Sequence, residues 1–167
     1  AKNTALSMFE RESMTYSEMG DRVAYVTSML VGAGLKAGDK VALLSSSMPN
    51  WGVCYFAAVN AGMVIVPIMP EFSGAELDKI IAHSEAKALC VSDKLYTKLS
   101  DETKERMNIV IRTKNLGIIS QRCTEQGEAA EPQPDDLAAI IYTSGTTSAP
   151  KGVMLTQKAL ATQVEIC

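Results

Sequence analysis

Short apolar runs alternate with amphipathic stretches along most of this 167-residue chain, and this alternation constrains the fold more than any other feature. Each run is bounded by polar or turn residues and is shorter than a buried helix would be. Continuous apolar runs of this kind are typical of strands that are buried on both faces. Helices between such strands imply right-handed crossovers, so the sequence predicts an α/β fold with a mainly parallel sheet flanked by helices. The predicted strands lie at 41–44, 64–68, 87–91, 108–111 and 137–142.

Local signals predict where the helices begin. Thr15 followed by Glu18, and Ser73 followed by Glu76, are capping-box patterns, in which two side chains satisfy free N–H groups of a first turn. Pro49 suits the first turn of another helix, and Thr156 can cap a last one. The predicted helices lie at 15–34, 49–62, 76–84, 94–106 and 156–167.

The composition fits one domain of ordinary size, since 47% of the residues are hydrophobic and can form a core. A polar stretch, 113–136, has little hydrophobic period and is predicted to be a surface connection. The apolar stretch 57–69 is too short and too interrupted to span a bilayer, and no signal-peptide pattern opens the chain. We therefore expect a cytoplasmic protein without a transmembrane segment, for which peripheral membrane association stays open.

Charge and cysteine content argue against two function classes. The net charge is −3 and no long Lys/Arg run is present, so nucleic acid is not an expected partner. The four cysteines are scattered without a C-x-x-C pair, and there is one histidine, so no metal site is predicted within the chain. Reduced thiols of a cytosolic protein are the expectation. The acidic residues Glu71, Glu76 and Asp78 are explained by capping and exposure.

The hydroxyl-rich segment 142–152 is the most informative part of the chain for function. Hydroxyls, glycine-permitted bends and one lysine can surround a polyphosphate with donors and a counter-charge. The spacing is neither that of a Walker loop nor that of the G-x-G-x-x-G dinucleotide motif. A Ser/Thr-rich turn between two strands is the alternative, and composition alone does not separate the two.

The order of motifs closely resembles the adenylate-forming superfamily, which includes acyl-CoA synthetases, peptide-synthetase adenylation domains and firefly luciferase. The pattern Tyr-Thr-Ser-Gly-Thr-Thr-x-x-Pro-Lys-Gly-Val at 142–153 resembles its signature loop. Segment 14–19 resembles its early Thr-Tyr-x-Glu-Leu element, and Ala61-Gly62 with Pro67 and Pro70 resembles its second block. The run 47–52, continued by 55–57, is most similar to fatty acyl-CoA ligases. The resemblance covers nearly the whole chain and implies an N-terminal part of the large N-terminal domain.

The resemblance also implies roles for single residues. Lys151 would anchor the loop or add positive charge near the leaving pyrophosphate, and Gly152 would serve the backbone. Ser148 stands where the family usually has glycine, so it would stiffen the loop or hold a compatible backbone angle. The residues implied to contact the β- and γ-phosphates of ATP are Thr143, Ser144, Gly145, Thr146 and Thr147, with Ser148 and Lys151 in the same loop.

The implied activity is that of an ATP-dependent, AMP-forming acid–thiol ligase. A carboxylic acid would react with Mg²⁺-bound ATP to give an acyl-adenylate, and coenzyme A would then displace AMP. In the family, the adenine pocket, the metal-coordinating acid and the lid with its catalytic lysine follow this loop. Residues 1–167 should therefore be a single subdomain fragment that is inactive without its C-terminal portion.

Several alternatives stay open at this point. The enzyme could instead be a peptide-synthetase adenylation domain or an aryl-CoA ligase, since the acid pocket is built mostly beyond this segment in the family. A non-catalytic α/β binding or scaffold module is the alternative from another class. His83, at the end of a predicted helix, is expected to be a capping or exposed histidine and not a catalytic base.

Overall fold

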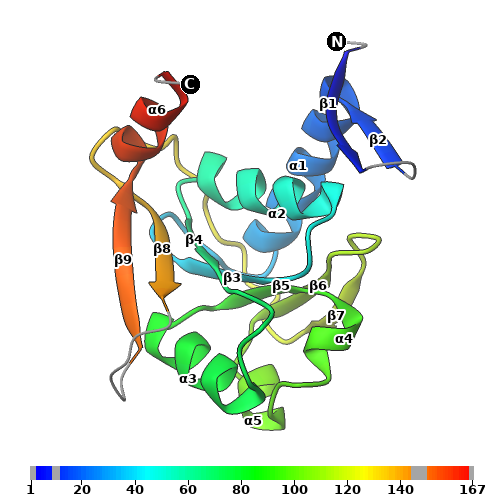
Figure 1. Cartoon of the computed structure of the whole chain (residues 1–167), viewed down its shortest axis with the longest axis vertical. Coiled ribbons are helices and arrows are strands. Elements are labelled where there is room, and N and C mark those ends of the chain that lie inside the picture. Colours follow the sequence, from blue (N-terminus) through cyan, green and yellow to red (C-terminus); the bar gives the residue numbers. More distant parts are fainter. Residues whose placement is uncertain (1–2, 9–11, 144–149, 166–167) are drawn as a thin grey trace.

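A seven-stranded sheet forms the centre of the computed structural model, which describes residues 3–8, 12–143 and 150–165 (Figure 1). Its five inner strands run parallel, and the two edge strands are antiparallel to their neighbours. The prediction of an α/β fold with a mainly parallel sheet is confirmed. In spatial order the strands are β7 (Ile118–Gln121), β6 (Ile109–Arg112), β5 (Ala88–Val91), β3 (Lys40–Leu44), β4 (Val64–Pro67), β8 (Leu137–Thr143) and β9 (Lys151–Thr156).

Helices cover both faces of this sheet (Figure 1). One face is covered by α1 (Tyr16–Val31) and α2 (Pro49–Asn60), the other by α3 (Gly74–Ser84), α4 (Asp93–Tyr96) and α5 (Asp101–Glu105). The last helix, α6 (Gln157–Glu165), follows β9. A hairpin of β1 (Thr4–Met8) and β2 (Glu12–Thr15), which the sequence did not predict, lies beside α1. No helix within the described ranges is long and apolar enough to cross a membrane.

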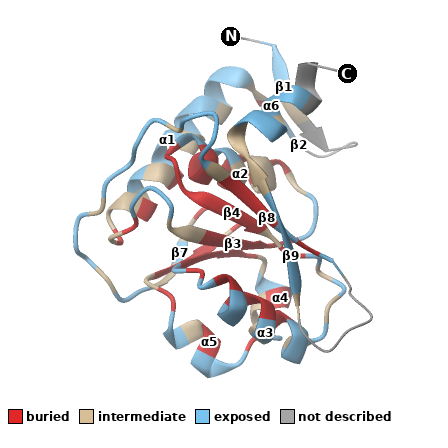
Figure 2. Cartoon of the chain, turned by 90° about the vertical axis from the view of Figure 1, so that its left-hand side faces the viewer, coloured by how far each residue is buried: buried red, intermediate tan, exposed pale blue. Residues whose placement is uncertain are grey.

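The strands divide their side chains between two hydrophobic cores, as the period of two in an extended chain requires. In β3, Val41 and Leu43 pack with α1 and α2, whereas Ala42 and Leu44 pack with α3. The inner strands are therefore buried on both sides, which Figure 2 shows as the buried centre of the molecule. Each large aliphatic side chain buried in this way contributes about 1.5–3 kcal/mol, so the two layers dominate the stability of the fold.

The predicted capping boxes both form. Thr15 Oγ1 accepts a hydrogen bond from the Glu18 N–H at 3.3 Å, while the Thr15 N–H donates to the Glu18 carboxylate at 2.8 Å. Ser73 and Glu76 make the same reciprocal pair at the start of α3, at 3.4 and 2.8 Å. Thr156 also caps as predicted, because its Oγ1 accepts from the Ala159 N–H at 3.2 Å. These local patterns thus fix the starts of α1, α3 and α6.

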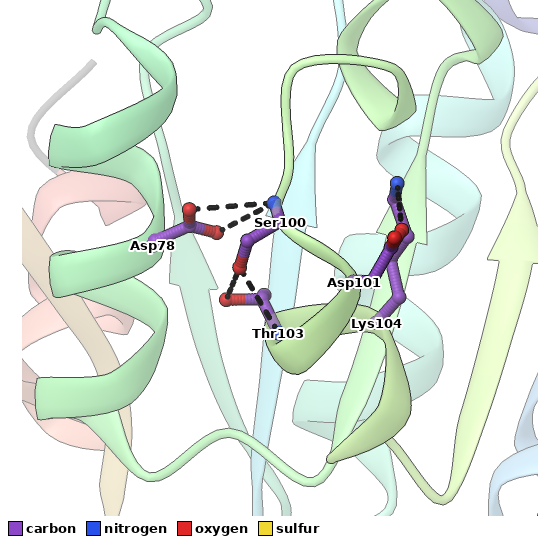
Figure 3. A network of polar contacts seen from close by, with 5 residues as sticks. All are labelled: Asp78, Ser100, Asp101, Thr103 and Lys104. Atoms are coloured by element: carbon purple, nitrogen blue, oxygen red, sulfur yellow. Dashed lines mark hydrogen bonds and ion pairs between the residues drawn. The ribbon is translucent and has the colours of Figure 1, made fainter.

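The prediction of one continuous helix over 94–106 is wrong, because the chain forms two short helices, α4 and α5, instead. In a continuous helix the Ser100 N–H would bond within the helix, but it donates to the carboxylate of Asp78 on α3, at 3.2 Å (Figure 3). Ser100 Oγ in turn accepts from the Thr103 N–H at 3.2 Å and caps α5. The break is therefore caused by a contact with another helix and by a new cap.

The segment 113–136 contains an edge strand, β7, that the sequence did not predict. It pairs with β6 in an antiparallel hairpin, with Val110 opposite Ser120. Leu116 lies in the tight connection with a positive φ of 57°, and its side chain is 5% exposed. The half-exposed pattern of β7 explains why its hydrophobic signal was weak. The stretch that follows runs back past α1, where the Glu128 N–H donates to the Leu35 carbonyl at 3.0 Å.

Candidate functional site

A hollow of about 670 Å³ lies at the carboxyl ends of β3, β4 and β8. Because these strands are parallel, the segments that leave them meet at one edge of the sheet, where ligands of open α/β sheets usually bind. The last described residue of β8, Thr143, is part of its lining. The lining residues are Ser45, Ser46, Ser47, Trp51, Tyr55, Pro67, Ile68, Met69, Pro70, Glu71, Ala139, Ile141, Tyr142 and Thr143.

One wall of the hollow is aromatic. Trp51 and Tyr55 lie one turn apart on α2, and their rings stack with centroids 5.4 Å apart and planes at 19°. Burial raises the pKa of Tyr55 and of Tyr142, so both phenols stay protonated at neutral pH. Glu71 is the one charged side chain among the described lining residues. The hollow therefore offers an apolar wall and neutral hydroxyls, with a single carboxylate at its rim.

The predicted phosphate loop begins at the end of β8, where Thr143 lines this hollow, and ends at the start of β9. Thr143 and Lys151 are cross-strand partners at the loop end of the hairpin, and both are exposed. The described parts of the loop thus bring the first and last predicted site residues together. Ser144, Gly145, Thr146, Thr147 and Ser148 lie outside the described residues, so their phosphate contacts stay a prediction.

The next pair of the hairpin, Tyr142 and Gly152, is packed closely. A Cβ atom on Gly152 would lie 2.6 Å from Ile140 Cγ2 and 3.3 Å from Tyr142 Cζ. A side chain at this position would therefore collide with Ile140 or displace the tyrosine ring. This close approach explains why glycine suits this position of β9, whereas the backbone role implied by the resemblance stays a prediction.

His83 makes a contact that sequence reasoning missed. It lies in the last turn of α3 and is exposed, as expected, but its Nδ1 is 2.7 Å from the hydroxyl oxygen of Tyr142. The two rings meet edge to face, with centroids 5.7 Å apart. The structure thus links α3 to the residue that directly precedes Thr143.

The acidic residues Glu71, Glu76 and Asp78 do not form a common site. Glu76 completes the capping box of α3, and Asp78 accepts from the Ser100 N–H (Figure 3). Hydrogen bonds from the Ser73 hydroxyl and backbone N–H hold the pKa of Glu76 below its usual range. Within the described ranges, no group of three His, Cys, Asp or Glu residues is placed to hold a metal ion.

A second cavity, of about 760 Å³, lies between α1, the start of α2 and the β6–β7 connection. Its lining includes Arg22, Asn50 and Lys114, but neither Thr143 nor Lys151. It is larger than the hollow but carries none of the described residues implied in phosphate binding. The hollow beside β8 is therefore the better candidate for the functional site.

Comparison with known families decides the class of protein. The AMP-binding enzyme family matches residues 1–167, the whole of this sequence. The chain is a member of the AMP-binding enzyme family. The sequence resemblance to adenylate-forming enzymes is confirmed at this level, whereas the narrower likeness to fatty acyl-CoA ligases is not.

Relatives of this AMP-binding chain belong to different classes of protein. A crotonobetaine/carnitine–CoA ligase of Proteus mirabilis is 32% identical over 178 residues, covering 93% of this chain and 34% of the relative. Nonribosomal peptide synthetase NPS2 of Ceriporiopsis subvermispora is 33% identical over 153 residues, covering 92% of this chain and 6% of the synthetase. ATP-bound MatB from Rhodopseudomonas palustris superposes with a TM-score of 0.79 at 27% identity, covering 97% of this chain and 33% of MatB. The chain thus spans about a third of the crotonobetaine/carnitine–CoA ligase and of MatB, and much less of the synthetase.

Trp51 and Tyr55 of this AMP-binding chain are not among the site residues that the sequence implied. The structure places both on the wall of the hollow. Their position could have been inferred from topology, because α2 directly follows β3 and begins at the carboxyl edge of the sheet. Periodicity alone gives no such information, since buried helices and ligand-facing helices share an apolar pattern.

Proposed function

We propose that this chain forms the N-terminal part of an ATP-dependent, AMP-forming acid–thiol ligase. In this proposal the loop 142–152 holds the β- and γ-phosphates of ATP. The observation that carries it is the position of the β8–β9 hairpin. Its loop end, marked by the Thr143–Lys151 pair, lies at the carboxyl edge of the parallel strands, next to the hollow.

The proposed reaction has two steps. A carboxylate oxygen attacks the α-phosphorus of ATP, and the bond to the β-phosphate oxygen breaks to release pyrophosphate. A thiol sulfur, that of coenzyme A in the favoured case, then attacks the acyl carbon, loses its proton and displaces AMP. Loop hydroxyls and backbone N–H groups would stabilise charge on the leaving pyrophosphate, and Lys151 would add a positive charge. Mg²⁺ would arrive bound to ATP, and the described residues supply no ligand set for it.

The favoured acid is a fatty acid, supported by the resemblance of the run 47–52 to fatty acyl-CoA ligases. A second candidate is an adenylation domain that loads an amino or aryl acid onto a carrier protein. It is favoured by the 33% identity to a nonribosomal peptide synthetase. The two candidates differ in the thiol, which is coenzyme A in the first and a carrier-bound phosphopantetheine in the second.

Pyrophosphate exchange by the full-length protein tests the proposal. Labelled pyrophosphate should enter ATP in the presence of the correct acid, and the assay is run across fatty, aryl and amino acids. Omission of the acid and replacement of ATP by ADP are the controls, because neither supports adenylation. ATP binding without exchange for any acid class would favour the non-catalytic module instead. Thioester formation with coenzyme A or with a carrier protein then separates the two candidates.

A further inference from the structure

We propose that His83 is a positioning residue for the phosphate loop and acts through Tyr142. The inference rests on the proposed function of that loop. His83 itself would touch no substrate. It would hold the hydroxyl of Tyr142, and through the tyrosine ring it would fix the strand ends from which the loop departs.

The contact between the two side chains is short, and its tyrosine partner is buried whereas its histidine partner is exposed. His83 Nδ1 lies 2.7 Å from Tyr142 Oη, and the tyrosine is 3% exposed. A buried phenol requires a hydrogen-bond partner, and within the described part of the chain His83 provides it. The phenol can donate to the imidazole nitrogen when Nδ1 carries no proton.

The tyrosine ring joins the two strands that flank the loop. Tyr142 is the cross-strand partner of Gly152, and the absent side chain of that glycine leaves space for the ring. The next pair toward the loop is Thr143 and Lys151. A shift of the ring would therefore move both ends of the loop together.

The helix that carries His83 is a rigid support. Its first turn is held by the Ser73–Glu76 capping box, and Leu77, Ile80 and Ile81 are buried under the sheet. His83 thus connects a fixed helix to a loop whose task requires fixed donors. Donors for a polyphosphate act best when they are held in place before the ligand binds, because small displacements weaken every contact.

The test compares ATP with AMP as calorimetric ligands of the full-length protein. AMP lacks the β- and γ-phosphates that the loop would hold, so a loop-positioning residue should affect ATP alone. His83→Ala should weaken ATP binding about tenfold, as expected when one buried hydroxyl loses its partner, and should leave AMP binding within about twofold. Tyr142→Phe should give the same change, because it removes the hydroxyl and keeps the ring.

Three further variants make the test specific. His83→Asn can place an amide atom near the position of Nδ1 and should restore most of the ATP affinity. The double variant His83→Ala/Tyr142→Phe should be no weaker than either single variant, since both remove one interaction. Lys79→Ala replaces an exposed residue one turn earlier on α3 and should change neither affinity.

The results also separate this inference from the proposed function. Equal losses for ATP and AMP, or a lower unfolding temperature with unchanged ATP affinity, would overturn the positioning role while the loop function stands. Unchanged affinities in both His83→Ala and Tyr142→Phe would do the same. A full-length protein that does not bind ATP at all would remove the proposed function and this inference with it.

Discussion

The amide of Asn50 links the start of α2 to Thr113, the residue that follows β6. Its Nδ2 donates to the Thr113 carbonyl at 2.8 Å, and its Oδ1 accepts from Arg22 Nη1 at 2.9 Å. The side chain is thus a bridge between α1, α2 and the β6–β7 connection, and it is 6% exposed. Buried polar groups of this kind are costly to leave without a partner.

Asn50→Ala should therefore lower the free energy of unfolding by about 1–3 kcal/mol. Urea denaturation followed by circular dichroism measures the change. Asn60→Ala is the matched control, because Asn60 is exposed at the other end of the same helix and its loss should cost less than about 0.5 kcal/mol. Equal effects of the two variants would contradict the bridging role.

The capping box of α3 predicts a dependence of stability on pH. Ser73 lowers the pKa of Glu76 from its ordinary value of 4.5, first through its hydroxyl and then through its backbone N–H. The folded state therefore keeps Glu76 ionised to lower pH than the unfolded chain does. Its stabilising contribution is complete above the ordinary pKa and is lost as the pH falls through the folded-state value.

When the pH is lowered from about 6 to about 3, the stability of the Glu76→Gln variant should therefore fall less than that of the unmodified chain. Thermal unfolding midpoints at several pH values provide the measurement. Glu105→Gln replaces an exposed carboxylate at the end of α5 and should follow the unmodified chain. A Glu76→Gln profile parallel to that of the unmodified chain would count against the capping contribution.

Two glycines should respond in opposite directions to the same substitution. Gly152→Ala should destabilise the hairpin, because the new Cβ would come within 2.6 Å of Ile140 Cγ2. Gly20→Ala should stabilise the chain by about 0.5–1 kcal/mol, because Gly20 lies inside α1 and alanine favours the helix. No atom lies within 4 Å of a Cβ at Gly20. Both variants are compared by chemical denaturation, and a gain in stability for Gly152→Ala would refute the packing argument.

The loop threonines should be essential to adenylation. Replacement of Thr146 and Thr147 by alanine in the full-length protein removes hydrogen bonds to charged groups worth about 1.5–3 kcal/mol each. Pyrophosphate exchange should therefore fall by at least about tenfold. Unchanged exchange in the double variant would show that the loop does not hold the phosphates as proposed.

Residues 1–167 alone should bind ATP weakly or not at all. Phosphate contacts must offset the loss of translational freedom and the desolvation of a highly charged ligand. The described residues add no metal-ligand group to help them. Calorimetry with this chain should find no micromolar affinity for ATP. A clear micromolar isotherm would show that residues 1–167 form a complete ATP site and would contradict the prediction.

The fold could be predicted mostly where the signal is local or where strands are buried on both faces. Strands β3 to β6 are apolar apart from Lys40 and Arg112 at their ends, and the capping boxes lie within four residues. The break between α4 and α5 was not predictable because it depends on Asp78, 22 residues earlier in the chain. Strand β7 was missed because it is half-exposed and too short to show a period.

In the candidate site too, features with a local sequence signal could be predicted and long-range contacts could not. The motif at 142–152 identified the loop, and the structure pairs Thr143 with Lys151 at its ends. The contact between His83 and Tyr142 joins residues 59 positions apart and has no local signature. Trp51 could not be identified as a site residue because a ligand-facing aromatic and a core aromatic have the same sequence pattern.

Strand β9 lies at one border of the sheet and pairs with β8 alone in the described part of the chain. Val153 and Met154 are 52% and 70% exposed there. A border of this kind offers backbone hydrogen-bonding groups and apolar side chains to any strand that approaches. In a purified preparation of residues 1–167, this border would favour edge-to-edge association, so the soluble fraction should fall as the concentration rises.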